Sequence, residues 1–145
     1  MLDLILAVLH HLIVFGLVAV VLAELISVRS GMDAAAVRRV AAIDVWYGIL
    51  AGLIVFVGFG RAIFAAKGWD YYAGNPFFWA KIATFVVIGL LSIPPTTAYV
   101  RWRKAGTAPA DEAVATVRRF LLLEMLLFAP LIAFAAAMAR GYGMS

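Results

Sequence analysis

The chain has 145 residues, of which 66% are hydrophobic and only 14% are charged. A soluble domain of this size cannot bury so much apolar surface, so the composition excludes a water-soluble globular protein. The sequence contains no cysteine, which excludes disulfides, iron–sulfur clusters and thiolate metal sites.

The hydrophobic residues gather into four blocks, at about residues 4–27, 40–65, 76–100 and 118–139. Each block has about 20 residues or more, enough for a helix to cross a hydrocarbon core of about 30 Å. Because the links between the blocks are short, consecutive spans should run antiparallel. The sequence therefore predicts an all-α membrane protein, in which one domain over residues 1–145 forms an up-down-up-down bundle of four transmembrane helices.

The basic residues are unevenly distributed between the two sides of this predicted bundle. The first and third links and their flanks carry Arg29, Arg38, Arg39, Arg101, Arg103, Lys104, Arg118 and Arg119. The opposite side carries Arg61, Lys67, Lys81 and Arg140. The positive-inside rule then predicts that the first and third links lie in the cytoplasm and both termini outside. Topology accounts for the net charge of +4 without a nucleic-acid partner.

The first span holds both histidines of the chain, His10 and His11. Asp3, His10, Leu17 and Glu24 follow each other at intervals of seven residues, so they fall nearly on one line of a helix. We expect this face to point into the bundle, whereas His11 is rotated from it by about 100°. Imidazoles are costly in lipid, which indicates that at least one of them binds a metal or cofactor. The alternative is that one ring donates to a backbone carbonyl and merely packs.

In the second span, Asp44 and Gly48 share a face and Gly52 lies beside it. Gly48 and Gly52 form a small-xxx-small pair, which lets a second backbone or a flat ligand approach closely. Plain helix packing explains the two glycines equally well. Asp44 lies about one turn inside the cytoplasmic end, where it could instead pair with Arg38 or Arg39.

The links carry recognisable helix boundaries. In the first link, Gly31 fits the end of one helix and Asp33 the cap of the next. Asn75 is expected to cap the third span, with Pro76 at the first helical position. The Pro94–Pro95 pair should kink or loosen that span near its inner end. We expect loops over residues 66–75, whose aromatic residues fit a membrane interface, and over residues 101–116.

Lys81 lies about one turn inside the outer end of the third span. Arg61 and the two histidines come from the same level, because the first span begins outside. Two cations near two imidazoles indicate a site for an anionic group, such as a carboxylate or a haem propionate. Alternatively, the lysine only extends its ammonium group to the membrane interface.

Three carboxylates, those of Glu24, Asp44 and Glu124, come from three spans and lie toward the cytoplasmic side. Together they could bind a cation or relay protons. They could equally pair with the basic residues of that level, which are Arg38, Arg39, Arg118 and Arg119.

Three features of the chain resemble a known group of membrane proteins. A histidine lies early in the first span, an arginine precedes a glycine-containing second span, and the third span starts with Trp79-Ala80-Lys81. The matching residues are His10 or His11, Arg38 or Arg39, and Gly48 with Gly52. In these features, and in the layout of nearly the whole chain, the sequence resembles the CopD-like superfamily. That superfamily includes the copper-resistance protein CopD, the HemJ-type protoporphyrinogen oxidases and several uncharacterised four-span families.

The chain also departs from the HemJ-type pattern. Leu25-Ile26-Ser27 stands where those proteins have Leu-Pro-Arg, and Pro94, Pro95 and Tyr99 stand where they carry a histidine cluster. The chain is more similar to an uncharacterised subfamily with a His-His first span and a Met-Ala-Arg-Gly ending, here Met138–Gly141. The resemblance implies a protein of the bacterial inner membrane that binds haem or copper.

Haem b is the favoured cofactor, because imidazole is its usual protein ligand and the bundle offers an apolar interior. Adjacent histidines diverge too far to hold both faces of one iron. Either one histidine binds the iron, or a homodimer brings the same histidine from two chains. The expected role is electron transfer or haem or porphyrin handling, and an enzyme of this kind would be a haem-dependent membrane oxidoreductase. The predicted cofactor-binding residues are His10, His11, Arg61, Lys81, Gly48 and Gly52.

Two other functions are consistent with the sequence. Copper handling or transport is one, because imidazole and thioether groups suit copper. The other is a proton-coupled carrier, or a structural subunit without a cofactor, in which Glu24, Asp44 and Glu124 form a proton or ion-pair site. The sequence indicates contact with membrane lipid, and it names no redox partner or quinone.

Overall fold

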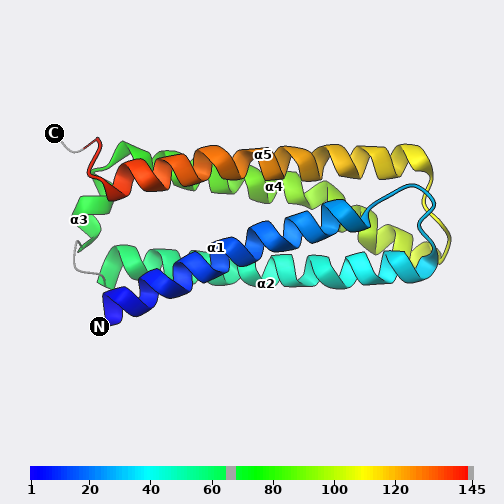
Figure 1. Ribbon diagram of the computed structural model, residues 1–145, viewed down its shortest axis with the longest axis horizontal. Helices are drawn as coiled ribbons and strands as arrows, with labels where there is room; N and C mark the ends of the chain where they lie inside the picture. Colours follow the sequence, from blue (N-terminus) through cyan, green and yellow to red (C-terminus); the bar gives the residue numbers. More distant parts are fainter. Residues whose placement is uncertain (65–67, 144–145) are drawn as a thin grey trace.

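The computed structural model describes residues 1–64 and 68–143, and all regular structure in these ranges is helical. Four long helices, α1 (Leu2–Ser27), α2 (Ala34–Phe64), α4 (Pro76–Ala105) and α5 (Asp111–Ala139), form an elongated antiparallel bundle (Figure 1). A short helix, α3 (Gly68–Ala73), lies at one end. Each long helix is long and apolar enough to cross a membrane. The predicted four-helix transmembrane bundle is confirmed.

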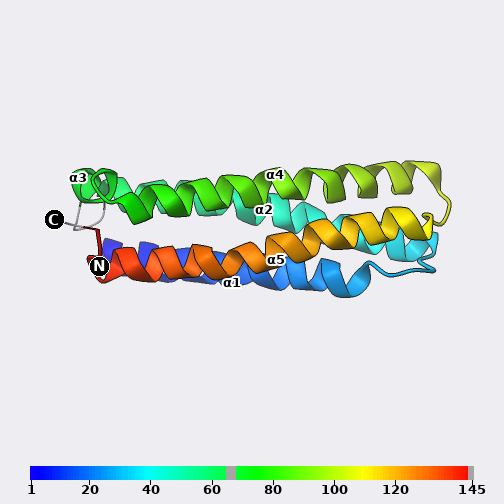
Figure 2. The ribbon, with the colours of Figure 1, turned by 90° about the horizontal axis from the view of Figure 1, so that it is seen from above.

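The four long helices form a ring in the order α1, α2, α4, α5. α1 packs mainly on α2 and α4 mainly on α5, while the α2–α4 and α1–α5 contacts are fewer. Both termini and α3 lie at one end of the bundle, here called the terminal end (Figures 1 and 2). The two loops over residues 28–33 and 106–110 lie at the other, the loop end. In such a ring, side chains from all four long helices can point into the same central space.

Three helix boundaries lie beyond the predicted spans. α2 begins at Ala34 rather than at about residue 40, and the predicted end of that span at residue 65 lies outside the described residues. The predicted loop over residues 101–116 is wrong, because α4 continues to Ala105 and α5 already begins at Asp111. Alanine, arginine and lysine are good helix formers, so the helices continue past the apolar segments that hydropathy detects. The predicted loop over residues 66–75 is also wrong in part, because Gly68–Ala73 forms α3.

The predicted caps at Asp33 and Asn75 are present, but Gly31 does not end α1, because that helix stops at Ser27 with Val28 as its C-cap. The Asp33 Oδ1 accepts a hydrogen bond of 2.7 Å from the Ala36 N–H at the start of α2. The Asn75 side chain accepts one of 2.9 Å from the Phe77 N–H, with Pro76 in the first turn of α4. The Asn75 amide also donates to the Tyr142 carbonyl at 3.1 Å, which ties the C-terminal segment to the α3–α4 corner. α4 runs through the Pro94–Pro95 pair as one helix.

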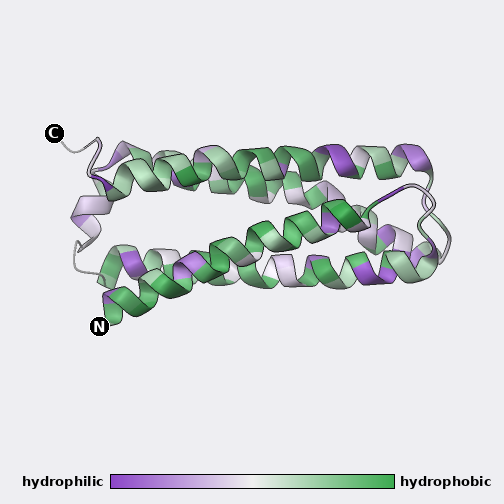
Figure 3. Ribbon diagram, viewed as in Figure 1, coloured by the Kyte–Doolittle hydropathy of each residue, from purple (hydrophilic) through white to green (hydrophobic). Residues whose placement is uncertain are grey.

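The interior divides into a large core and a small one. The large core joins buried apolar residues of all four long helices, among them Leu17, Val40, Tyr99 and Leu121. The small core at the terminal end contains Ala62, Tyr72 and Phe78. Figure 3 shows that polar residues interrupt the apolar helices at several levels inside the bundle. These interruptions locate the candidate site.

Candidate functional site

A cavity of about 440 Å³, here called the central cavity, lies between the four long helices in the half of the bundle nearer the terminal end. α1 contributes His10 and Leu17 to its wall, and α4 contributes Lys81. Most of the remaining wall is apolar, with α5 contributing Phe128 and Leu131. An apolar cavity with a few polar groups is the usual form of a small-molecule site.

His10 has an unsatisfied ring in the wall of the central cavity. Its Nδ1 is buried and has no hydrogen-bond partner in the part of the chain that the structure describes. Gly58 of α2 lies against the ring, since a Cβ at position 58 would be 3.4 Å from the His10 Cε1 and 3.7 Å from Nδ1. A buried polar nitrogen without a partner costs free energy, so such a group at a cavity is a candidate ligand-binding group.

Two cations accompany His10. The Lys81 ammonium lies 5.1 Å from the centroid of the Phe78 ring and belongs to the same cavity wall. Lys81 and Arg61 are both close enough to His10 to interact with it electrostatically. The Nε of Arg61 is buried and has no hydrogen-bond partner among residues 1–64 and 68–143, and neither cation forms an ion pair with a carboxylate of these residues. Cations without counter-ions beside a cavity favour an anionic group there.

His11 lies outside the wall of the central cavity. Its ring is exposed, and its Nδ1 lies 2.6 Å from the Ala7 carbonyl oxygen. The His10 and His11 rings meet edge to face, with centroids 6.2 Å apart. His11 thus fits the alternative in which a histidine of the first span bonds a backbone carbonyl and only packs, whereas the Nδ1 of His10 makes no such bond among the described residues.

Gly48 and Gly52 mark no close approach of a second helix within the described chain, and their role in binding a flat ligand stays a prediction. Both are exposed, and a Cβ at either position would have no neighbour within 4 Å. The close approaches are instead at Gly58, against His10, and at Gly16, where a Cβ would lie 3.2 Å from the Leu50 Cδ1. Spacing identifies a small face of a helix, but the crossing of the helices decides which glycine on it is covered.

A second polar level, here called the carboxylate layer, consists of Glu24, Asp44 and Glu124. Glu24 and Glu124 are only 2% and 1% exposed, and the Oε1 of each is buried with no hydrogen-bond partner among the described residues. The Tyr99 hydroxyl of α4 donates to the Glu24 Oε2 at 3.2 Å. The Thr96 hydroxyl donates to the Asp44 Oδ1 at 2.8 Å. The structure therefore brings the three carboxylates to one level, as the sequence predicts.

The alternative that these carboxylates pair with arginines is wrong for the described chain. None of the three forms an ion pair there. Arg118 donates to the Leu25 carbonyl at 2.7 Å and to the Val28 carbonyl, so it binds the C-terminal end of α1 instead. Within residues 1–64 and 68–143, no three His, Cys, Asp or Glu side chains converge to hold a metal ion.

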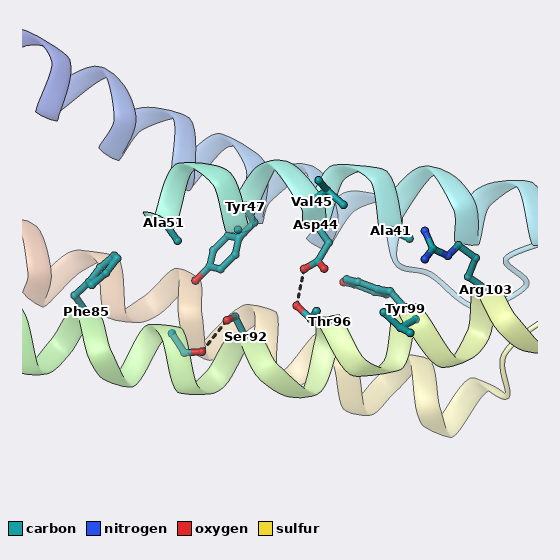
Figure 4. A pocket seen from close by; sticks show the side chains of 13 residues that line it. Ala41, Asp44, Val45, Tyr47, Ala51, Phe85, Ser92, Thr96, Tyr99 and Arg103 are labelled. Carbon is teal, nitrogen blue, oxygen red and sulfur yellow. Dashed lines mark hydrogen bonds between the residues drawn. The ribbon is translucent and has the colours of Figure 1, made fainter. Parts of the chain in front are cut away.

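A second cavity of about 520 Å³, here called the lateral cavity, lies between α2 and α4 and is lined by these two helices alone. Asp44 and Tyr99 lie between the helices, with Thr96 bonded to Asp44 and Arg103 toward the loop end (Figure 4). Phe85 also lines it, together with Gly89, and both residues line the central cavity as well. A shared wall therefore separates the two cavities.

Comparison with known proteins identifies the family to which this chain belongs. Residues 2–143 match a family model described as a predicted membrane protein, DUF2214. The chain belongs to this family. No curated protein and no solved structure matches it. The family match supports the assignment of the four long helices as membrane spans.

Proposed function

We propose that the protein binds haem b in the central cavity, and that it serves in electron transfer or in haem or porphyrin handling. His10 is the iron ligand, and Lys81 and Arg61 face the propionates. One observation carries the proposal: a buried imidazole nitrogen lies in the wall of an apolar cavity beside two cations, and neither the nitrogen nor the cations have a partner or counter-ion among the described residues. Haem combines an apolar ring, an iron that takes imidazole and two carboxylates, so it suits each of these groups.

The resemblance to the HemJ-type proteins supports the same choice. Two of its three features, the first-span histidine and the lysine of Trp79-Ala80-Lys81, supply His10 and Lys81. These are the two ionisable residues that line the central cavity. The cavity also falls within the range of about 300–1,000 Å³ that is usual for small-molecule sites.

Copper handling has less support from the donor set. Among the described residues, no group of three or more His, Cys, Asp or Glu side chains gathers around His10, whereas copper sites combine several such donors. Met138 packs against the small core at the terminal end.

The central cavity is lined by the helices of one chain, so each haem would be bound by one His10 from that chain. The predicted homodimer stays a prediction. His11 is the exposed ring of the pair and hence the one that a second chain could reach.

Absorption spectroscopy tests the proposal. The protein is expressed with ample haem, purified in mild detergent, and measured in the oxidised and dithionite-reduced states. We expect a Soret band in the wild type and in His11→Ala, and its loss in His10→Ala. Gel filtration checks that all three are folded. A colourless wild type contradicts haem binding, and equal loss in both variants contradicts the choice of His10.

A further inference from the structure

The carboxylate layer carries more charge than the bundle can stabilise. Glu24 and Glu124 are almost fully buried, each with an oxygen that has no partner among the described residues. Both interact electrostatically with Asp44 and with each other. Two buried carboxylates without a cation cannot both stay charged in a medium of low dielectric constant. The layer must therefore hold a proton or bind a cation.

The geometry favours a proton. A bound metal ion needs several ligands around one point, and the described acidic side chains do not converge in that way. Every helix of the ring faces the layer with groups that can hold or pass a proton: Glu24 on α1, Asp44 and Tyr47 on α2, Thr96 and Tyr99 on α4, and Glu124 on α5.

The cations of this region are occupied or at its edge. Arg118 is bonded to the carbonyls of Leu25 and Val28, and Arg103 lies in the wall of the lateral cavity toward the loop end. Neither forms an ion pair with the layer among the described residues.

Tyr99 connects the buried layer to the lateral cavity. Its ring lines that cavity, and its hydroxyl donates to the Glu24 Oε2. Asp44 lines the same cavity and accepts from Thr96 (Figure 4). Water that enters between α2 and α4 thus meets one carboxylate directly and reaches a second through one hydroxyl.

We propose that Glu24, Asp44 and Glu124 form a proton relay, which exchanges protons with water at the loop end through the lateral cavity and delivers them toward the central cavity. In each step one O–H bond breaks on the donor, water or a carboxylic acid, and one forms on the accepting carboxylate or hydroxyl. No oxidant or reductant takes part. Phe85 and Gly89 line both cavities, so protons pass at this shared wall into the central cavity and leave the bundle at the terminal end, on the opposite side of the membrane. The relay does not depend on haem.

Proton flux into vesicles tests the relay. The full chain is reconstituted into vesicles that contain a pH-sensitive dye, and a potassium gradient with valinomycin drives protons inward. We expect faster acidification than in protein-free vesicles, and loss of this flux in Glu24→Gln and Glu124→Gln. Glu112→Gln, in the exposed first turn of α5, is the matched control and should keep the flux. A wild-type flux equal to that of protein-free vesicles overturns the relay, and so does wild-type flux in both glutamine variants.

An infrared measurement covers the case in which a variant reconstitutes poorly. At neutral pH the wild type should show the carbonyl absorption of a protonated carboxyl group, and Glu24→Gln or Glu124→Gln should remove it. In D₂O the band should shift, more slowly in Tyr99→Phe, because that variant lacks the hydroxyl between the cavity and Glu24. Absence of the band in the folded wild type overturns the proposal.

Discussion

The central and lateral cavities differ in charge and in enclosure, although they share Phe85 and Gly89. The central cavity is surrounded by all four long helices and has only cationic or titratable nitrogen groups at its wall, those of His10 and Lys81. The lateral cavity is lined by two helices and has the acidic and hydroxyl groups of the carboxylate layer beside it. Neither set of charges is neutralised by the other, because each lies at its own level. Charges left unpaired in the interior of a bundle point to function rather than stability.

The two cavities should differ most clearly in haem binding when the central cavity is filled by a larger side chain. In Gly58→Leu, the new side chain would meet the His10 ring, which a Cβ alone already approaches to 3.4 Å. We expect complete loss of bound haem, measured as the Soret absorbance per protein. Gly52→Leu is the matched control on the same helix, because a Cβ there meets nothing within 4 Å. Equal haem content in the two variants would contradict the placement of haem in the central cavity.

A smaller effect is expected from removing one cation of the central cavity. Lys81→Met keeps most of the side-chain volume and removes a charged hydrogen-bond donor. Bonds to charged groups contribute about 1.5–3 kcal/mol, so haem should bind roughly 10- to 100-fold more weakly. Titration of haem into the apoprotein measures this.

The comparison variant for Lys81→Met is Lys104→Met, at the exposed end of α4. It should bind haem like the wild type. If both variants weaken binding alike, the effect is not specific to the cavity.

The sequence predicts the bundle and its polar levels because hydropathy and helical periodicity act locally. The seven-residue spacing correctly places Leu17 and Glu24 in the interior and His10 in the cavity wall. The caps at Asp33 and Asn75 are equally local, since each side chain bonds a backbone N–H two or three residues away. Such features need no knowledge of the neighbouring helices.

Contacts between helices are harder to predict from the sequence. Helical periodicity does not distinguish Gly58 from Gly48, because it gives a face but not the level at which another helix crosses that face. The partners of Arg118 cannot be predicted for a related reason: they are backbone carbonyls of α1, which leave no signature in the residue types. The lateral cavity follows from the sparse packing of α2 on α4, which likewise depends on the whole ring.

The carboxylate layer should differ from the central cavity in its effect on stability. Glu124→Leu replaces a buried carboxyl group, one oxygen of which has no partner among the described residues, by an apolar side chain. An unsatisfied buried polar group costs about 1–3 kcal/mol, whereas the hydrogen bond with Tyr47 that the variant also loses contributes about 1 kcal/mol, so the variant should be more stable by up to about 2 kcal/mol. Reversible unfolding in mixed micelles with a denaturing detergent measures the free energy. Glu112→Gln at the surface should change it by less than about 0.5 kcal/mol. Destabilisation by Glu124→Leu would show that the carboxylate has a stabilising partner.

The smallest effect is expected at the mouth of the layer, where a polar group does have a partner. Thr96→Val keeps the side-chain shape and removes the hydroxyl that donates to Asp44, so it should lower the free energy of unfolding by about 1 kcal/mol. Thr97→Val is the neighbouring control, because the Thr97 hydroxyl is exposed and donates only within its own helix, to the Pro94 carbonyl. A larger loss in Thr96→Val than in Thr97→Val shows that Asp44 depends on its partner across the lateral cavity. Equal losses would mean that the bond between α2 and α4 contributes nothing, and that Asp44 is satisfied by water entering the cavity.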